Sequence, residues 1–76
     1  MKVLFFGVLT EAAGTNELEM ETIFKNTTVL KAHLLSRFPA LEKYDFKFAV
    51  NEELVNGEVL LQKEDEIALL PPYAGG

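Results

Sequence analysis

The chain has 76 residues, of which 49% are hydrophobic and 25% are charged, enough for one small globular domain and too few for two. Its 12 acidic and 7 basic residues give a net charge of −5, and the basic residues do not cluster, so a nucleic-acid partner is disfavoured. A core of this size leaves little volume for a catalytic cleft. We therefore expect a single domain over residues 1–76 that is not an enzyme on its own.

Cysteine is absent from the chain, which excludes a disulfide framework, a thiolate metal site and a side-chain thioester. The apolar run in MKVLFFGVL is too short for a membrane span and is not followed by a small-residue cleavage site. We expect a cytoplasmic protein with no membrane partner, no metal and no bound cofactor. The single histidine, His33, and the acidic runs at Glu52–Glu53 and Glu64–Glu66 are expected to be solvated, because adjacent carboxylates lack the spacing of metal ligands.

The first two predicted elements form a hairpin. The stretch KVLFFGVL (2–9) is rich in strand-forming residues and predicts a strand with Val3 and Phe5 on one face and Leu4, Phe6 and Val8 on the other. After a turn at Gly14, the stretch GTNELEMETI (14–23) alternates apolar and acidic residues, which is typical of an antiparallel partner strand.

One helix is predicted over NTTVLKAHLLSRFP (26–39), with Thr27 or Thr28 as its cap and an apolar stripe formed by Leu30, Leu34 and Phe38. A third strand, FKFAV (46–50), is expected to turn Phe46, Phe48 and Val50 inward. Asn56-Gly57 predicts a tight turn, and EIALL (66–70) predicts the last strand, with Ile67 and Leu69 on one face and Ala68 and Leu70 on the other.

This order predicts an α+β fold, a β-grasp (ubiquitin-like) roll with a mixed sheet of four to five strands and one main helix. The first and last strands are both apolar on both faces, so we expect them to run parallel at the centre of the sheet. A ferredoxin-like fold would require a second helix.

The last six residues, Pro71 to Gly76, form a predicted extended, flexible tail. Pro71 and Pro72 have no amide proton to continue a ladder, and the segment reaches up to ~20 Å at about 3.3 Å per residue. Gly75 and Gly76 could pass through a narrow channel because they lack a Cβ. The carboxylate of Gly76 would need activation by another protein before it could transfer anything. A frayed end remains the alternative.

The motifs KVLFFG, EAAG, TTVLKAHLLSRFP, FAVNEELV and DEIALLPPYAGG together resemble the ubiquitin-like sulfur carriers of cofactor biosynthesis, most closely the family of molybdopterin synthase small subunits. The resemblance covers nearly the whole chain, and the closing DEIALLPPYAGG is its most specific part. The chain departs from the family pattern at Glu64, where many members have glycine; we interpret this as a turn variation.

The resemblance implies a sulfur carrier in molybdenum cofactor biosynthesis. An activating enzyme would use ATP to adenylate Gly76, which would become a thiocarboxylate. The tail residues Pro71, Pro72, Tyr73, Ala74 and Gly75 would enter the large synthase subunit, where sulfur is delivered to a pyranopterin precursor. Two carriers and a large-subunit dimer would form a heterotetramer. Exposed apolar side chains at Phe6, Leu54 and Leu70 would bind the partner.

Three alternatives remain open at this point. The chain could be a thiazole-type or other sulfur carrier, or a protein modifier joined to lysine through an isopeptide bond. It could also be a β-grasp module that binds partners without covalent chemistry. Phe6, Leu54 and Leu70 could instead belong to a second small core covered by loops.

Overall fold

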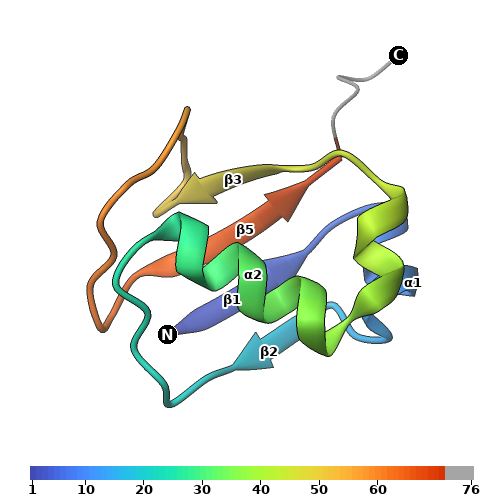
Figure 1. Cartoon of the computed structure of the whole chain (residues 1–76), viewed down its shortest axis with the longest axis horizontal. Helices are drawn as coiled ribbons and strands as arrows, with labels where there is room; N and C mark the ends of the chain where they lie inside the picture. The colour runs from blue at the N-terminus through green and yellow to red at the C-terminus, as the bar shows by residue number, and fades with distance from the viewer. Residues whose placement is uncertain (72–76) are drawn as a thin grey trace.

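Two parallel strands, β1 (Lys2–Phe5) and β5 (Glu66–Leu70), occupy the middle of the sheet in the computed structural model, which describes residues 1–71 (Figure 1). The five strands have the order β2-β1-β5-β3-β4. The other pairings, β1 with β2, β3 with β5 and β3 with β4, are antiparallel. The remaining strands are β2 (Glu17–Glu19), β3 (Lys47–Val50) and β4 (Glu53–Leu54), and β2 and β4 form the edges of the sheet. The predicted β-grasp fold is confirmed.

The register of the central pair places the predicted inward residues side by side. Val3 pairs with Ile67 and Phe5 pairs with Leu69, and all four side chains are buried. Both strands have a neighbouring strand on each side, as expected of strands that are apolar on both faces. The predicted inward face of both strands is therefore confirmed.

The main helix, α2 (Thr27–Arg37), packs across this inward face through Leu30 and Leu34, which have no exposed surface. Its cap is Asn26, whose Oδ1 accepts a hydrogen bond from the Val29 amide at 2.9 Å. The prediction that Thr27 or Thr28 is the cap is wrong, because the cap is the residue before Thr27. Thr27 lies in the helix, and its buried hydroxyl accepts a hydrogen bond from the Val59 amide at 3.1 Å.

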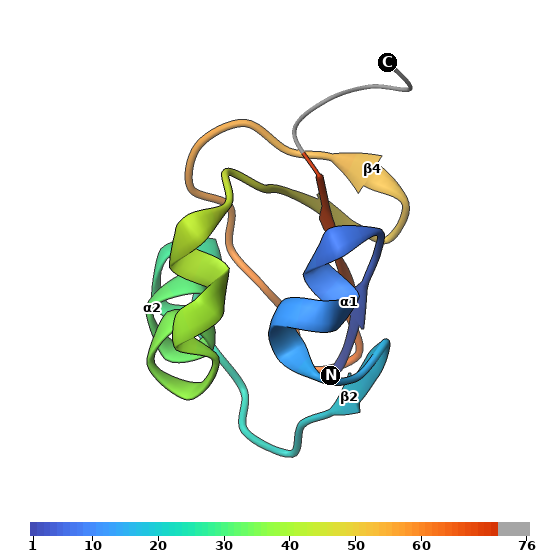
Figure 2. The ribbon, with the colours of Figure 1, turned by 90° about the vertical axis from the view of Figure 1, so that its right-hand side faces the viewer.

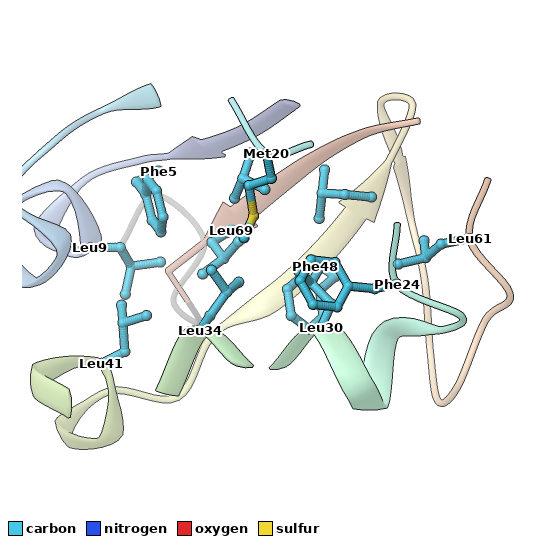
Figure 3. Close-up of a cluster of buried hydrophobic side chains, with 12 residues drawn as sticks. Phe5, Leu9, Met20, Phe24, Leu30, Leu34, Leu41, Phe48, Leu61 and Leu69 are labelled. Atoms are coloured by element: carbon cyan, nitrogen blue, oxygen red, sulfur yellow. The ribbon is translucent and has the colours of Figure 1, made fainter. Parts of the chain in front are cut away.

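The core lies between the sheet and α2 (Figure 3). A short 3-10 helix, η1 (Pro39–Lys43), follows α2 and contributes the fully buried Leu41. The ring of Phe38, between these helices, meets Phe5 edge-on with 5.7 Å between centroids. The buried apolar cluster consists of Val3, Phe5, Leu9, Met20, Phe24, Leu30, Leu34, Leu41, Phe48, Leu61, Ile67 and Leu69.

A second, short helix, α1 (Val8–Ala13), replaces the predicted continuation of the first strand, so the prediction of a strand through Val8 is wrong, while the predicted one main helix, α2, is confirmed. The strand ends because Gly7 has φ 58°, which most residues avoid. The turn is fixed by hydrogen bonds from the Leu9 amide to the Phe6 carbonyl and from the Thr10 amide to the Gly7 carbonyl, both 3.1 Å. Figure 1 shows α1 beyond the end of β1, where Leu9 is buried.

A tight turn that was not predicted joins β3 to β4 at Asn51 and Glu52, while the chain also bends at the predicted Asn56-Gly57, where Gly57 has φ 75°. Asn51 and Glu52 have positive φ, 52° and 70°, as a type I′ turn requires. The Asn51 side chain accepts a hydrogen bond from the Glu66 amide at 3.0 Å and donates one to Asp65 at 2.9 Å. These bonds fix the turn to the start of β5.

The acidic run before β5 is more than a solvated turn. Asp65 accepts a hydrogen bond from the Gln62 amide at 2.7 Å as well as the bond from Asn51, so its carboxylate closes the loop. Glu66 is the first residue of β5. Glu64 is not among the positive-φ residues, so its backbone does not require the glycine found in the family pattern.

Phe5 and Phe6 form a matched pair for testing the two faces of the sheet, because their exposed fractions are 2% and 45%. We predict that Phe5→Ala lowers the free energy of unfolding by about 3–5 kcal/mol through lost burial and a residual cavity. Phe6→Ala should lower it by less than about 1 kcal/mol. Urea unfolding followed by circular dichroism measures both values, and equal losses would contradict the assignment of the faces.

Candidate functional site

The C-terminal segment is the first part of the candidate site, and the structure describes only its base. Of the predicted tail residues, Pro71 is described and is partly buried. Pro72, Tyr73, Ala74, Gly75 and Gly76 lie outside the described residues. The prediction of an extended, flexible tail therefore remains a prediction.

The base of this segment follows β5, which pairs with a neighbouring strand on each side. β5 pairs with β1 from Lys2↔Glu66 to Phe5↔Leu69 and with β3 from Lys47↔Leu70 to Val50↔Ile67. Leu69, two residues before Pro71, has no exposed surface. The chain after Leu70 therefore continues from a strand that is hydrogen-bonded to a neighbour on each side.

The outward face of the sheet is the second part of the candidate site. The register aligns Leu4, Ala68, Ala49 and Leu54 in one row across four strands. Alternation adds Leu70 on β5 and Phe6 just beyond β1 to the same face. We call these six residues the outer patch. Figure 2 shows α2 on the opposite side of the sheet, and no helix within residues 1–71 covers this face.

The three predicted partner residues all belong to the outer patch. Phe6 is 45% exposed and Leu54 62% exposed, whereas Leu70 is half-buried. Loops of the described chain therefore do not bury Phe6 and Leu54 in a second core. Leu4 and Ala68 are partly buried and Ala49 is buried, with 5% exposure, so they form the floor of the patch between the more exposed residues. The row that they form depends on which strands are neighbours, which the sequence does not show.

Charged residues occupy the opposite end of the outward face. Lys2 and Glu66 pair across β1 and β5, and Lys2 Nζ lies 3.9 Å from Glu17 Oε2. The N-terminal amino group lies 3.4 Å from Glu19 Oε2. Exposed ion pairs of this kind contribute little stability. Lys47 pairs with Leu70 on the same face, so charged residues border the outer patch at both ends of the sheet.

The described residues do not assemble a conventional catalytic centre. Within residues 1–71, no group of three or more His, Asp or Glu side chains is placed to hold a metal ion. The prediction that His33 is solvated is wrong. Its ring packs against Phe24 with 4.9 Å between centroids, and its Nε2 is buried without a hydrogen-bond partner in the described structure. His33 therefore contributes to packing below α2, far from the outer patch in the fold.

None of the helices that the structure describes is long and apolar enough to cross a membrane.

The candidate site consists of an apolar surface beside the C-terminal segment. Such a surface can bind another protein, because exposed apolar patches mark interaction sites. The described residues supply no nucleophile with an adjacent base, so a reaction at this site would require groups from elsewhere.

Curated relatives match the chain along its full length. The molybdopterin synthase sulfur carrier subunit of Escherichia coli K12 is 35% identical over 80 residues, covering 100% of this chain and 99% of the relative. The protein of the same name from Chlamydomonas reinhardtii is 36% identical over 81 residues, covering 100% of this chain and 98% of the relative.

Solved structures give the same result for the fold. The small archaeal modifier protein 1 of Methanosarcina acetivorans superimposes with a TM-score of 0.79 at 29% identity, over 99% of this chain and 94% of that one. A chain of the complex of subunits 1 and 2 of molybdopterin-converting factor from Helicobacter pylori 26695 gives a TM-score of 0.71 at 26% identity, over 99% and 96%.

The model of the ThiS family matches residues 3–76, which include the base of the tail, its last residue and all of the outer patch. Together with the full-length similarity to molybdopterin synthase sulfur carrier subunits, this match shows that the chain belongs to the ThiS family.

Proposed function

We propose that the chain is a sulfur carrier in molybdopterin biosynthesis and acts as the small subunit of a molybdopterin synthase. The observation that carries this proposal is the full-length similarity to proteins named molybdopterin synthase sulfur carrier subunit. The structure adds a physical rationale, because β5 leads directly from the buried core to the segment that ends in Gly75-Gly76. The protein would act in the cytoplasm, where biosynthetic partners meet it.

The proposed chemistry takes place at the carboxylate of Gly76. A carboxylate is a poor electrophile at neutral pH, so an activating enzyme first joins its oxygen to the α-phosphorus of ATP, and diphosphate leaves. A sulfur nucleophile then attacks the carbonyl carbon, AMP leaves, and a thiocarboxylate remains. ATP is bound by the activating enzyme and not by this chain. Without cysteine, the chain has no side-chain thiol that could carry the sulfur instead.

The outer patch is the proposed binding surface for the large subunit. A chain similar to this one belongs to a complex of subunits 1 and 2 of molybdopterin-converting factor in Helicobacter pylori. Phe6, Leu54 and Leu70 would bury their apolar surface there, while Pro71 to Gly76 enter the large subunit and deliver sulfur to a pyranopterin precursor. Two carriers on a large-subunit dimer would give a heterotetramer.

A second candidate function is protein modification. It is favoured by the 29% identity and TM-score of 0.79 shared with a small archaeal modifier protein. The activated Gly76 would then be attacked by the amine of a lysine, and an isopeptide bond would form. Both functions use the same adenylated intermediate, so they differ in the nucleophile and not in the carrier. A thiazole-type pathway would likewise differ in the acceptor of the sulfur.

Deletion of Gly75 and Gly76 separates carrier functions from non-covalent binding. We predict that the shortened chain binds the large subunit through the outer patch and keeps its free energy of unfolding, because both deleted residues follow the last strand. It should lose sulfur transfer completely, since the residue that would be activated is missing. Full activity of the shortened chain in a reconstituted synthase assay would reject the carrier proposal.

Charge placed in the outer patch should weaken the complex selectively. We predict that Phe6→Glu lowers affinity for the large subunit by at least about tenfold, because a carboxylate would be desolvated at the centre of an apolar interface. Leu60→Glu is the matched control, since Leu60 is 70% exposed and lies in a bridge with Asn26, outside the patch. Isothermal titration calorimetry gives the affinities, and equal effects of both variants would reject the patch as the interface.

A further inference from the structure

Gly7 and Pro71 approach each other more closely than two ordinary residues could. A Cβ atom built on Gly7 would lie 2.9 Å from Pro71 Cγ and 3.8 Å from Pro71 Cδ. Gly14 and Gly57 also have positive φ, but a Cβ on either meets nothing within 4 Å. The glycine at position 7 is therefore distinguished by its neighbour and not by its backbone alone.

Both sides of this contact are held by hydrogen bonds. On one side, the Thr10 amide donates to the Gly7 carbonyl at 3.1 Å, and the Thr10 hydroxyl donates to the Phe5 carbonyl at 3.0 Å. On the other side, the Phe6 amide donates to the Leu69 carbonyl at 3.2 Å, which extends the pairing of β1 with β5 to the last residues before Pro71. Hydrogen bonds therefore hold the turn between β1 and α1 in place, and the Pro71 ring packs against it.

The contact also borders the outer patch. Phe6 precedes Gly7 and Leu70 precedes Pro71, so the two patch residues nearest the tail are the chain neighbours of the two contacting residues. A partner that binds Phe6 and Leu70 would therefore meet the tail at the point where Pro71 rests on Gly7.

We propose that Gly7 is a positioning residue for sulfur transfer, an inference that rests on the proposed carrier function. The absence of a side chain at position 7 lets Pro71 lie against the turn, and this contact sets the direction in which the chain leaves the outer patch. Gly7 takes no part in the chemistry; it acts through Pro71.

The direction at Pro71 matters because of the length of chain that follows. Residues 72–76 span at most about 17 Å, so when the large subunit holds them extended, a small rotation at their base would move the reacting carbonyl by several Å. A displacement of about 1 Å at a reacting centre can cost on the order of a hundredfold in rate. A side chain at position 7 would displace the Pro71 ring and so lower the rate of transfer while leaving the outer patch intact.

A double-mutant cycle tests the proposal. Gly7→Ala, Gly7→Val and Pro71→Ala, which removes the ring carbon at 2.9 Å, are each made alone, and each Gly7 variant is also combined with Pro71→Ala. Gly14→Ala is the control for a side chain at positive φ with no neighbour within 4 Å, although its left-handed helical backbone (φ 76°, ψ 10°) differs from that of Gly7 (φ 58°, ψ −137°). Each carrier, loaded as the thiocarboxylate, is mixed with excess large subunit and precursor, and the single-turnover rate, the dissociation constant and the unfolding midpoint are measured.

We expect the rate at saturating large subunit to fall by about tenfold or more in Gly7→Val and by less in Gly7→Ala, with the dissociation constant changed less than about threefold. Pro71→Ala alone should lower the rate, because it removes the contact, and a side chain at position 7 should then cost little more. Gly14→Ala should change only the unfolding midpoint. Backbone strain at position 7 is the same with and without the Pro71 ring, so the non-additivity of the two substitutions isolates the contact.

Two results would overturn the inference. One is a Gly7→Val or Gly7→Ala carrier that transfers sulfur at the wild-type rate. The other is a loss of rate that persists unchanged in the Pro71→Ala background, which would assign the effect to the turn itself. If the wild-type carrier transfers no sulfur, the proposed function fails, and the positioning role fails with it. Gly7→Ala keeps the test decisive if Gly7→Val does not fold.

Discussion

The parallel pairing of β1 with β5 is the constraint on which the rest of the structure depends. It joins the two ends of the chain at the centre of the sheet, with Val3 against Ile67 and Phe5 against Leu69. Because side chains alternate along a strand, the same pairing buries one face under α2 and leaves the outer patch on the other. It also brings the turn after β1 next to the residue after β5, which is why Gly7 and Pro71 meet.

Function follows from this arrangement by a division of roles. The core holds β5 in place, the outer patch presents an apolar surface, and the segment after Leu70 continues from the edge of that surface. A protein with no cysteine and no assembled catalytic side chains among residues 1–71 can still carry a reactive group if that group is the end of its chain. In the proposed function, the surface would provide the specificity and the partners would provide the catalysis.

The sequence predicted what depends on alternation and failed where structure depends on local geometry. Continuous apolar runs in 2–9 and 66–70 predicted both central strands, and the alternation of side chains along a strand predicted their inward faces. The helix α1 was missed because Val8 and Leu9 continue an apolar run, and only the positive φ of Gly7 separates them from β1. Asn-Gly favours positive φ, and Gly57 has it, but the tight turn at Asn51-Glu52 was missed because it depends on the hydrogen bonds of Asn51 to Asp65 and Glu66.

The candidate site shows the same limit. Phe6, Leu54 and Leu70 were predicted from alternation and resemblance, and alternation also placed Leu4 with Phe6 and Ala68 with Leu70. The row that joins Leu4 and Ala68 to Ala49 and Leu54 became known only with the strand order. The contact of Gly7 with Pro71 joins positions near opposite ends of the chain, and no local pattern in the sequence indicates it.

The central claim is that Gly76 carries the sulfur, and intact-mass spectrometry tests it most directly. The full chain is incubated with ATP, a sulfur donor and an activating enzyme, with the chain lacking Gly75 and Gly76 as the control. We predict that the full chain gains the mass difference between one sulfur and one oxygen atom, that fragmentation places the gain on Gly76, and that the control gains nothing. A full chain that stays unchanged, under conditions that convert an established carrier, would contradict the account.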